Sequence, residues 1–155
     1  MAGSALLRQA RREDALRLHE LHTASVRTLC ASHYSAEIID GWLQHRSPDG
    51  YAAPIKRGAI FVAETGNQAV GFGEAAAGVV VAVYVDPSVI RQGVGSALLR
   101  HALELARRQH NGSVRVESTL NATGFYAKHG FREIGRATTK RGRVEVPIVR
   151  MELAH

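Results

Sequence analysis

The chain has 155 residues and a formal net charge of +6, with 45% hydrophobic and 22% charged residues. This balance is typical of a globular protein, so we expect a single domain over residues 1–155 and exclude a disordered chain. No apolar run reaches the roughly 18 to 20 residues of a membrane helix. Residues 1–12 lack the apolar core of a secretory signal, and the one cysteine, Cys30, has no partner for a disulfide. We therefore expect a cytoplasmic protein without a membrane partner.

The first third of the chain predicts one strand and two helices. Residues 5–9 are typical of a short strand, and apolar residues recur at helical spacing over 13–29. Ser35 is a suitable N-cap for a second helix, which includes Trp42. Prolines and a glycine then predict a loop over 47–54.

The rest of the chain alternates strands with helices. Turn residues separate two strands at 59–64 and 69–74, which predicts a β-hairpin. Residues 79–85 are nearly all apolar and β-branched, as is typical of a central strand covered on both faces. The later elements are a helix over 96–109, a strand over 113–118, a short helix over 121–129 and strands over 131–136 and 144–153. The order β-α-α-β-β-β-α-β-α-β-β indicates an α+β fold with a mixed sheet and a parallel crossover at its centre.

A candidate anion site lies where the central strand leads into the long helix. Gly93 and Gly95 flank Val94 at the start of that helix, where unpaired backbone N–H groups and the helix dipole attract a phosphate. Glycines let a bulky pyrophosphate approach the backbone, and Arg91 adds a positive charge. A dinucleotide fold is excluded because Leu98 stands where that motif needs a small residue, and the chain has no Gly-Lys-Ser/Thr phosphate loop. A tight turn without a ligand remains the alternative.

A second motif reads Asn-Ala-Thr-Gly-Phe-Tyr-Ala-Lys-His-Gly-Phe over 121–131. Taken alone, its Phe125 and Tyr126 could be core aromatics. The motif follows Val-Tyr-Val-Asp-Pro at 83–87 and Ser-Ala-Leu-Leu at 96–99, and together they resemble the GNAT N-acetyltransferase superfamily. The order of elements is similar along essentially the whole chain. The likeness implies a GNAT-like splayed sheet flanked by helices and an acetyl-CoA-dependent N-acyltransferase.

The resemblance also implies an acetyl-CoA site where strands 79–85 and 113–118 separate. Backbone groups of the first strand would pair with the pantetheine arm, the glycine turn would bind the pyrophosphate, and Asn121 would contact the arm. The implied cofactor-binding residues are Val83, Tyr84, Val85, Arg91, Gln92, Gly93, Val94, Gly95, Ser96, Asn121 and Tyr126. Two positions depart from the family, since Ile90 replaces a usual Gln or Arg and Arg91 replaces a common glycine. We expect an altered loop geometry or a weaker affinity, with the site retained.

Acetyl transfer needs a proton for the departing thiolate and a base for the amine. The resemblance places Tyr126 near the sulfur, and a phenol is an acid well matched to a thiolate of comparable basicity. The central strand carries no carboxylate, so Glu74 at the end of the preceding strand is the candidate base, acting through water. Glu117 is expected to be structural. A backbone N–H of the splayed strand would polarise the thioester carbonyl.

The acceptor is expected in a pocket built by residues 29–42, where Tyr34 and Trp42 would form walls; core packing of Trp42 is the alternative. A small-molecule amine and a peptide both stay open as substrates, as does a homodimer. The basic surplus would suit nucleic acid, but no recognition motif supports that partner. The histidines and the cysteine between 19 and 33 match no zinc spacing, so we expect no metal. The alternative function is an acyl-CoA-binding regulatory module with little turnover.

Overall fold

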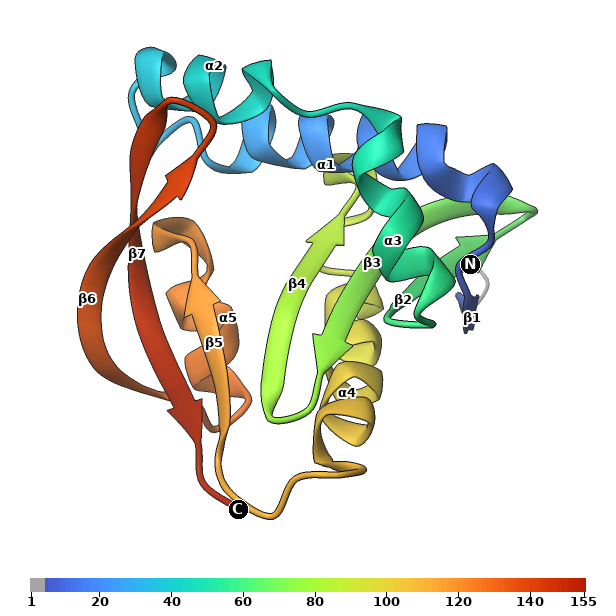
Figure 1. Ribbon diagram of the computed structural model, residues 1–155, viewed down its shortest axis with the longest axis vertical. Coiled ribbons are helices and arrows are strands. Elements are labelled where there is room, and N and C mark those ends of the chain that lie inside the picture. Colours follow the sequence, from blue (N-terminus) through green and yellow to red (C-terminus); the bar gives the residue numbers. More distant parts are fainter. Residues whose placement is uncertain (1–4) are drawn as a thin grey trace.

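The computed structural model describes residues 5–155 (Figure 1). Residues 1–4 lie outside the described part. They belong to the segment 1–12, for which the sequence predicts no secretory signal. The strands form one seven-stranded mixed sheet in the order β1-β2-β3-β4-β5-β7-β6. They are β1 (Leu6–Gln9), β2 (Ile60–Thr65), β3 (Gln68–Ala76), β4 (Val79–Val85), β5 (Val114–Ser118), β6 (Arg132–Arg141) and β7 (Val144–Leu153). The helices are α1 (Ala15–Leu29), α2 (Ala36–Gln44), α3 (Ala52–Lys56), α4 (Val94–Arg107) and α5 (Thr123–Lys128).

The two central strands, β4 and β5, run parallel but separate soon after they begin (Figure 1). They pair only through the first two residues of β4, Val79 and Val80. On its other edge β4 carries a β-bulge: Ala82 pairs with Glu74 of β3 and Val80 pairs with the next residue of β3, which leaves Val81 as the extra residue. A bulge bends its strand and increases the local twist, so β4 turns away from β5 beyond this point.

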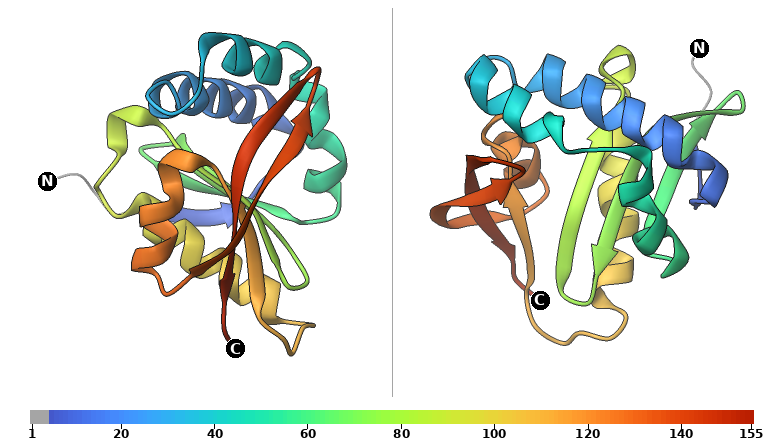
Figure 2. Two further views of the ribbon diagram at one scale, coloured as in Figure 1. Left: turned by 90° about the vertical axis from the view of Figure 1, so that its left-hand side faces the viewer. Right: turned by 45° about the horizontal axis from the view of Figure 1, so that its top comes forward.

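Helices cover both faces of the sheet (Figure 2). On one face, the buried side of α4, which includes Leu98, packs with Tyr126 of α5 and with the strands. On the other face, Leu21 of α1 packs above β2 and β3, and Trp42 of α2 packs with Ile148 of β7. An opening between β4 and β5 therefore connects the α4–α5 face with the α1–α2 face. None of the helices described over 5–155 combines the length and hydropathy that crossing a membrane requires.

The predicted α+β fold and mixed sheet are confirmed, and the predicted order of elements is observed with one addition. The segment predicted as a loop contains a 3-10 turn (Pro48–Tyr51) followed by α3. Prolines predicted the loop, but Pro48 and Pro54 each lie in the first turn of a helix, where no backbone N–H is required. The side chain of Tyr51 is buried and anchors the segment in the core.

The expectation that the strand over 79–85 is covered on both faces is wrong at Val79 and Val81, which are 39% and 44% exposed. The strand is central in the order of the sheet, as predicted, but the divergence of β5 leaves its far half without a neighbour on that side. Its apolar side chains therefore line an opening as well as fill the core.

Candidate active site

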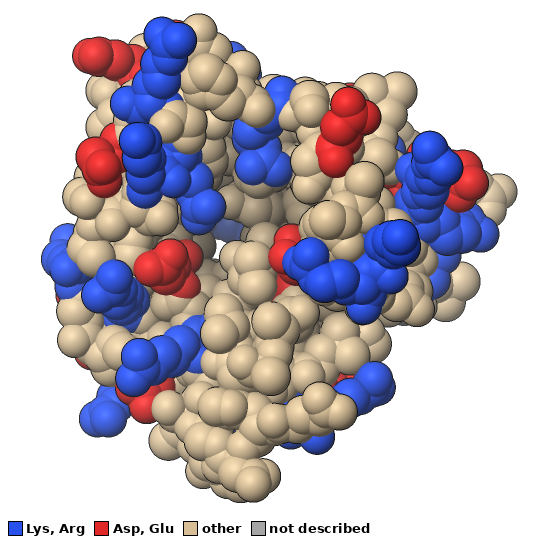
Figure 3. All heavy atoms as spheres, in the orientation of Figure 1, with Lys and Arg blue, Asp and Glu red and all other residues tan. Residues whose placement is uncertain are grey.

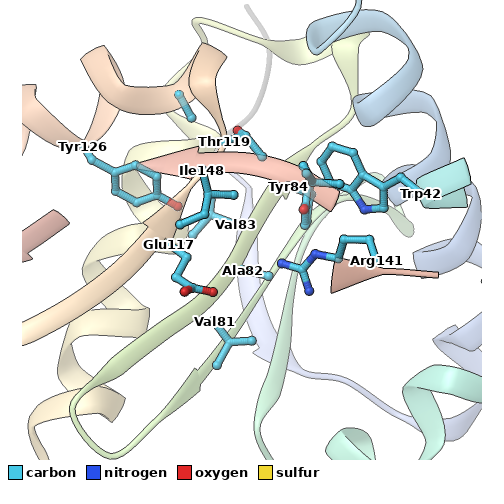
Figure 4. Close-up of a pocket in the computed structure, with 12 residues that line it drawn as sticks. Trp42, Val81, Ala82, Val83, Tyr84, Glu117, Thr119, Tyr126, Arg141 and Ile148 are labelled. Atoms are coloured by element: carbon cyan, nitrogen blue, oxygen red, sulfur yellow. The ribbon is translucent and has the colours of Figure 1, made fainter. Parts of the chain in front are cut away.

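The separation of β4 from β5 opens a cleft that passes through the sheet (Figure 4). Tyr126 of α5 lies at one end, and Trp42 of α2 and Arg141 of β6 lie at the other (Figure 4). Between them, β4 contributes residues 81–84 and β7 contributes Val146 and Ile148. In Figure 3 the hollow between β4 and β5 is bordered by Lys and Arg side chains toward α1 and α2. The cleft thus reaches both faces of the sheet.

The edge of β4 that faces the cleft has unpaired backbone groups. The N–H of Asp86 donates to the C=O of Val70 at 2.8 Å, which fixes the alternation of the β3–β4 ladder. In an antiparallel pair, every second residue directs its N–H and C=O away from its partner strand. Val83 and Val85 are these residues, and β5 pairs no further than Val80. An extended chain in the cleft would find hydrogen-bonding partners there.

The loop before α4 has an uncommon backbone conformation. Arg91 has a φ of 65° and Gly93, the N-cap of α4, has a φ of 84°. A left-handed conformation costs a non-glycine residue roughly 1 to 2 kcal/mol, which explains why a glycine suits the position of Arg91. The neighbouring side chain of Ile90 is exposed and points away from the core. The loop is therefore strained at the position where this chain departs from the family pattern.

The first turn of α4 presents free backbone donors beside this loop. The first intrahelical bond runs from the N–H of Ala97 to the C=O of Gly93, at 3.1 Å, so the N–H groups of the preceding turn, Val94 to Ser96, have no acceptor within the helix. The hydroxyl of Ser96 lies 3.0 Å from Nε2 of His129, which ties the start of α4 to the end of α5. Gln92 is exposed in the loop. These groups can hold an anion.

Gly95 keeps the space between α4, α5 and β4 open. A Cβ atom at this position would lie 3.3 Å from Cε1 of Phe125 and 3.6 Å from Cγ2 of Val85. At Gly93, by contrast, an added Cβ would meet nothing within 4 Å, but the positive φ disfavours any side chain there. The two glycines of the turn therefore serve different purposes: one sets the backbone and the other clears the path toward the cleft.

Tyr126 is buried, with 5% of its surface exposed, and its ring packs edge-on against Phe125 and Phe131. Its hydroxyl points into the cleft between Ile148 and Glu117 (Figure 4). Burial raises the pKa of this phenol above its ordinary value, so the hydroxyl keeps its proton at neutral pH.

Asn121 is held by Cys30. The thiol of Cys30 donates to Oδ1 of Asn121 at 3.2 Å, which joins the end of α1 to the segment before α5. Burial raises the pKa of this thiol to about 11, so it stays protonated and is a poor nucleophile. Within residues 5–155 the amide nitrogen of Asn121 has no hydrogen-bond partner, so it is available to a ligand. Among residues 5–155, no group of three or more His, Cys, Asp or Glu side chains is arranged to hold a metal ion.

The two aromatic residues expected in the acceptor pocket differ in their surroundings. Trp42 is 2% exposed and lines the cleft, so it belongs both to the core and to the pocket wall. Tyr34 lies outside the lining of the cleft: its hydroxyl donates to the C=O of Pro147 at 2.6 Å and accepts from the N–H of Leu120 at 2.9 Å. Its ring contacts Trp42 edge-on. Tyr34 therefore acts on the cleft by fixing its neighbours.

Tyr84 and Glu74 lie on the α1–α3 side of the sheet. The ring of Tyr84 lines the cleft and lies 4.0 Å from the ring of His22, while its backbone pairs with Phe72 of β3. Glu74 is half-buried beside the cleft and is not part of its lining, although its register partner Ala82 is. Burial raises the pKa of the Glu74 carboxyl, and the charges of nearby arginines oppose this only in part.

Three polar residues of the cleft were missed from the sequence: Glu117, Thr119 and Arg141. Glu117 was expected to be structural, and its carboxylate does lie 3.6 Å from Nε of Arg150, but it also faces the cleft. Its exposed place between two buried residues of β5 could have been found from the alternation of that strand. The position of Arg141 depends on the packing of the turn between β6 and β7 against α2, which is far away in the sequence. A local sequence pattern does not predict such a contact.

Replacement of Glu74 by glutamine is expected to stabilise the protein in a pH-dependent way. Burial raises the folded-state pKa, so the charged carboxylate destabilises the fold above that pKa, and this cost vanishes as pH falls below the ordinary value of 4.5. Thermal unfolding should show a higher Tm for Glu74→Gln than for wild type at about pH 8 and an equal Tm at about pH 4. Glu145→Gln, at an exposed position of β7, is the control. A gain in Tm that does not change with pH would contradict the assignment.

A mixed sheet that opens between two parallel strands, beside a glycine turn and a helix N-terminus, defines an acyltransferase of the GNAT type. Residues 30–154 match the family model described as Acetyltransferase (GNAT) domain. The chain therefore belongs to the GNAT acetyltransferases.

Two relatives and two solved structures agree with this assignment. The chain is 26% identical over 132 residues to the uncharacterized N-acetyltransferase YafP of Escherichia coli, covering 85% of this chain and 81% of that one. It is 43% identical over 56 residues to the peptidyl-lysine N-acetyltransferase YjaB of Salmonella typhimurium, covering 36% and 37%.

Among solved structures, a GCN5-related N-acetyltransferase from Rhodopseudomonas palustris matches with a TM-score of 0.92 at 24% identity, over 100% of this chain and 98% of that one. PaiA N-acetyltransferase from Thermoplasma acidophilum, solved in complex with coenzyme A, matches with a TM-score of 0.79 at 22% identity, over 99% and 100%. At these identities the two structures establish the likeness of the fold.

Proposed function

We propose that this GNAT acetyltransferase moves an acetyl group from acetyl-CoA to an amine of a small molecule or peptide by direct attack in a ternary complex. The observation that carries the proposal is the arrangement of three groups beside β4: the free N–H groups of the first turn of α4, the unpaired backbone of Val83 and Val85, and the hydroxyl of Tyr126. A candidate phosphate site, a strand edge with free hydrogen-bonding groups and a buried proton donor therefore follow one another in space beside β4. This arrangement suits a long thioester that carries a phosphate group at one end.

The residues present fit acetyl-CoA. The N–H groups from Arg91 to Ser96 would bind the pyrophosphate, and the backbone of Val83 and Val85 would pair with the pantetheine arm. Asn121 would use its free amide nitrogen on the same arm. That PaiA was solved with coenzyme A supports this choice of cosubstrate. Bound in this way, acetyl-CoA supplies the activated acetyl carbon.

The chain's own groups would then move two protons. As the amine nitrogen bonds to the acetyl carbon and the C–S bond breaks, Tyr126 donates its proton to the departing sulfur. A backbone N–H on the unpaired edge of β4 stabilises the charge on the carbonyl oxygen. Glu74 accepts the amine's proton through water, because its raised pKa makes it a stronger base than an ordinary carboxylate. Glu117 is the poorer candidate since Arg150 engages its carboxylate.

A second candidate function is an acyl-CoA-binding regulatory module with little turnover. The exposed Ile90 favours it, because a usual Gln or Arg of the phosphate loop is missing there. The strained backbone of Arg91 also favours the binding module, as does the position of Glu74 outside the lining of the cleft. Binding of acetyl-CoA is common to both candidates, and only turnover separates them.

CoA is expected to raise the Tm of the protein more than ATP or NADH at equal concentration. A ligand that binds only the native state stabilises it by RT ln(1 + [L]/Kd), about 2.7 kcal/mol at 100 times Kd. The pantetheine arm, which ATP and NADH lack, would use the edge of β4 in addition to the phosphate site. Thermal unfolding over a concentration series checks this. An equal rise with all three ligands would indicate generic binding of polyanions to a chain of charge +6.

A further inference from the structure

Among residues 5–155, two arginines at or near the end of the cleft that Trp42 lines have no anionic partner. Arg141 lines the cleft, and Arg46 follows α2 and donates to the hydroxyl of Tyr51 at 2.6 Å. The Nε atoms of both are buried without a hydrogen-bond partner within residues 5–155. Neither arginine forms an ion pair within that part of the chain. A guanidinium is always charged, and a buried donor left unpaired is costly, so this end of the cleft is prepared for an anion.

The packing of the turn between β6 and β7 against α2 directs Arg141 toward the cleft. The sequence over 140–143 has the pattern of a solvated basic turn, and Lys140 and Arg143 are indeed exposed. Gly142, however, has a φ of 59° and lies so close to α2 that an added Cβ would be 2.8 Å from the C=O of Gly41. This close packing directs Arg141 inward.

His22 indicates that the charges of the two arginines act on the same region. Burial, together with the charges of Arg46 and Arg141, holds the pKa of His22 well below its ordinary value. The imidazole is therefore neutral at physiological pH and adds no third positive charge. The positive potential at this end of the cleft comes from the two arginines.

A carboxylate faces the same cleft from the opposite side. Glu117 points into it from β5, on the side of Tyr126, while Arg141 points into it from β6 (Figure 4). The ion-pair partner of Glu117 is Arg150, at 3.6 Å, and not Arg141. A ligand lying between the two side chains meets a positive charge at one end and a negative charge at the end where Tyr126 lies. The walls between these ends include the apolar residues Val83 and Ile148, and Trp42 lies at the same end as Arg141.

We propose that the acceptor is a free α-amino acid with an apolar side chain, bound with its carboxylate against Arg141 and its amine toward Glu117 and Tyr126. This inference rests on the proposed acetyl transfer and names its acceptor class. The α-ammonium group first loses one proton to water, and the neutral nitrogen then bonds to the acetyl carbon as it gives a second proton to the base. The C–S bond breaks, and the sulfur takes up one proton. The products are the N-acetyl amino acid and CoA.

The test compares L-leucine with two acceptors that lack its carboxylate, L-leucinamide and 3-methylbutylamine. The wild-type kcat/KM for L-leucine should exceed that for either analogue by at least about tenfold, since hydrogen bonds to a charged group are the strong ones. Arg141→Gln should remove this difference in kcat/KM. Arg141→Lys keeps the charge but loses the bidentate hydrogen bonding of the guanidinium group, so it should remove part of the difference. Arg143→Gln, in the same turn but exposed, should leave it unchanged. KM for acetyl-CoA should stay constant throughout.

A binding measurement separates failure of this inference from failure of the proposed function. With CoA present, calorimetry should show N-acetyl-L-leucine binding at least about tenfold more tightly than N-(3-methylbutyl)acetamide, and only with Arg141 intact. If that holds but no amine is acetylated, the carboxylate site stands and acetyl transfer is wrong. If 3-methylbutylamine or a lysine peptide is acetylated as well as L-leucine, and Arg141→Gln changes nothing, acetyl transfer stands and the amino-acid acceptor is wrong.

Discussion

Replacement of Tyr126 by phenylalanine is expected to lower kcat by at least about 100-fold, while the affinity for acetyl-CoA changes by less than about threefold. The hydroxyl is needed as charge develops on the departing sulfur, and not in the resting complex. Because the phenol lies in a buried site that raises its pKa, it holds its proton across the usual assay range. The wild-type rate should therefore show no loss from its ionisation up to about pH 10.

Tyr34→Phe is the matched control for this variant. The Tyr34 hydroxyl bonds to the backbone of Pro147 and Leu120, so its loss should cost stability, about 1 to 3 kcal/mol, and change kcat little. The Tyr126 hydroxyl points into the cleft instead, so Tyr126→Phe should unfold at nearly the wild-type temperature. Wild-type turnover in Tyr126→Phe at saturating acceptor would remove Tyr126 from the mechanism and leave it as a core aromatic.

Gly95→Val is expected to weaken acetyl-CoA binding at least tenfold, a loss of about 1.4 kcal/mol or more. A Cβ atom alone would lie 3.3 Å from Phe125, and the branches of valine extend farther into the space between α5 and β4. The proposed route of the pantetheine arm runs through this space. Calorimetry with acetyl-CoA measures the effect, and circular dichroism confirms that the helices remain.

Gly124→Ala provides the comparison, because Gly124 lies in α5 with nothing within 4 Å of an added Cβ. Its affinity for acetyl-CoA should match that of wild type. Gly93→Val is a less informative variant, since its φ of 84° would strain the loop whatever the ligand. An unchanged affinity in a folded Gly95→Val protein would mean that the cosubstrate takes another path.

The sequence was most informative where a pattern is local. The bounds predicted for β4 and β7 are those observed, because valine dominates β4 and β-branched residues recur through the first half of β7. The glycine turn was also readable, since left-handed backbone and helix starts have their own residue preferences. Hydrophobic periodicity likewise located α1 and α4 to within a few residues.

What could not be predicted depends on contacts between distant segments. No pattern within β4 shows that Val81 is an extra residue, because a bulge is defined by the register against β3. The sequence does not distinguish the roles of Tyr34 and Trp42. The hydrogen-bond partners of the Tyr34 hydroxyl come from Pro147 of β7 and from Leu120, which are distant in the sequence. From the sequence alone, Arg141 is one of several residues in a basic turn. Only the packing of Gly142 against α2 shows that its side chain is directed toward the cleft.

The most direct test of direct acetyl transfer follows both the protein and its products after mixing with isotopically labelled acetyl-CoA. Without an amine, mass spectrometry should find no acetylated protein, and no CoA should be released. With an acceptor added, CoA and the N-acetyl product should appear in equal amounts, and varying both substrates should give intersecting kinetic patterns. Acetylated protein before the amine is added would contradict direct attack. Tight binding of acetyl-CoA without release of CoA to any amine would instead identify a binding module.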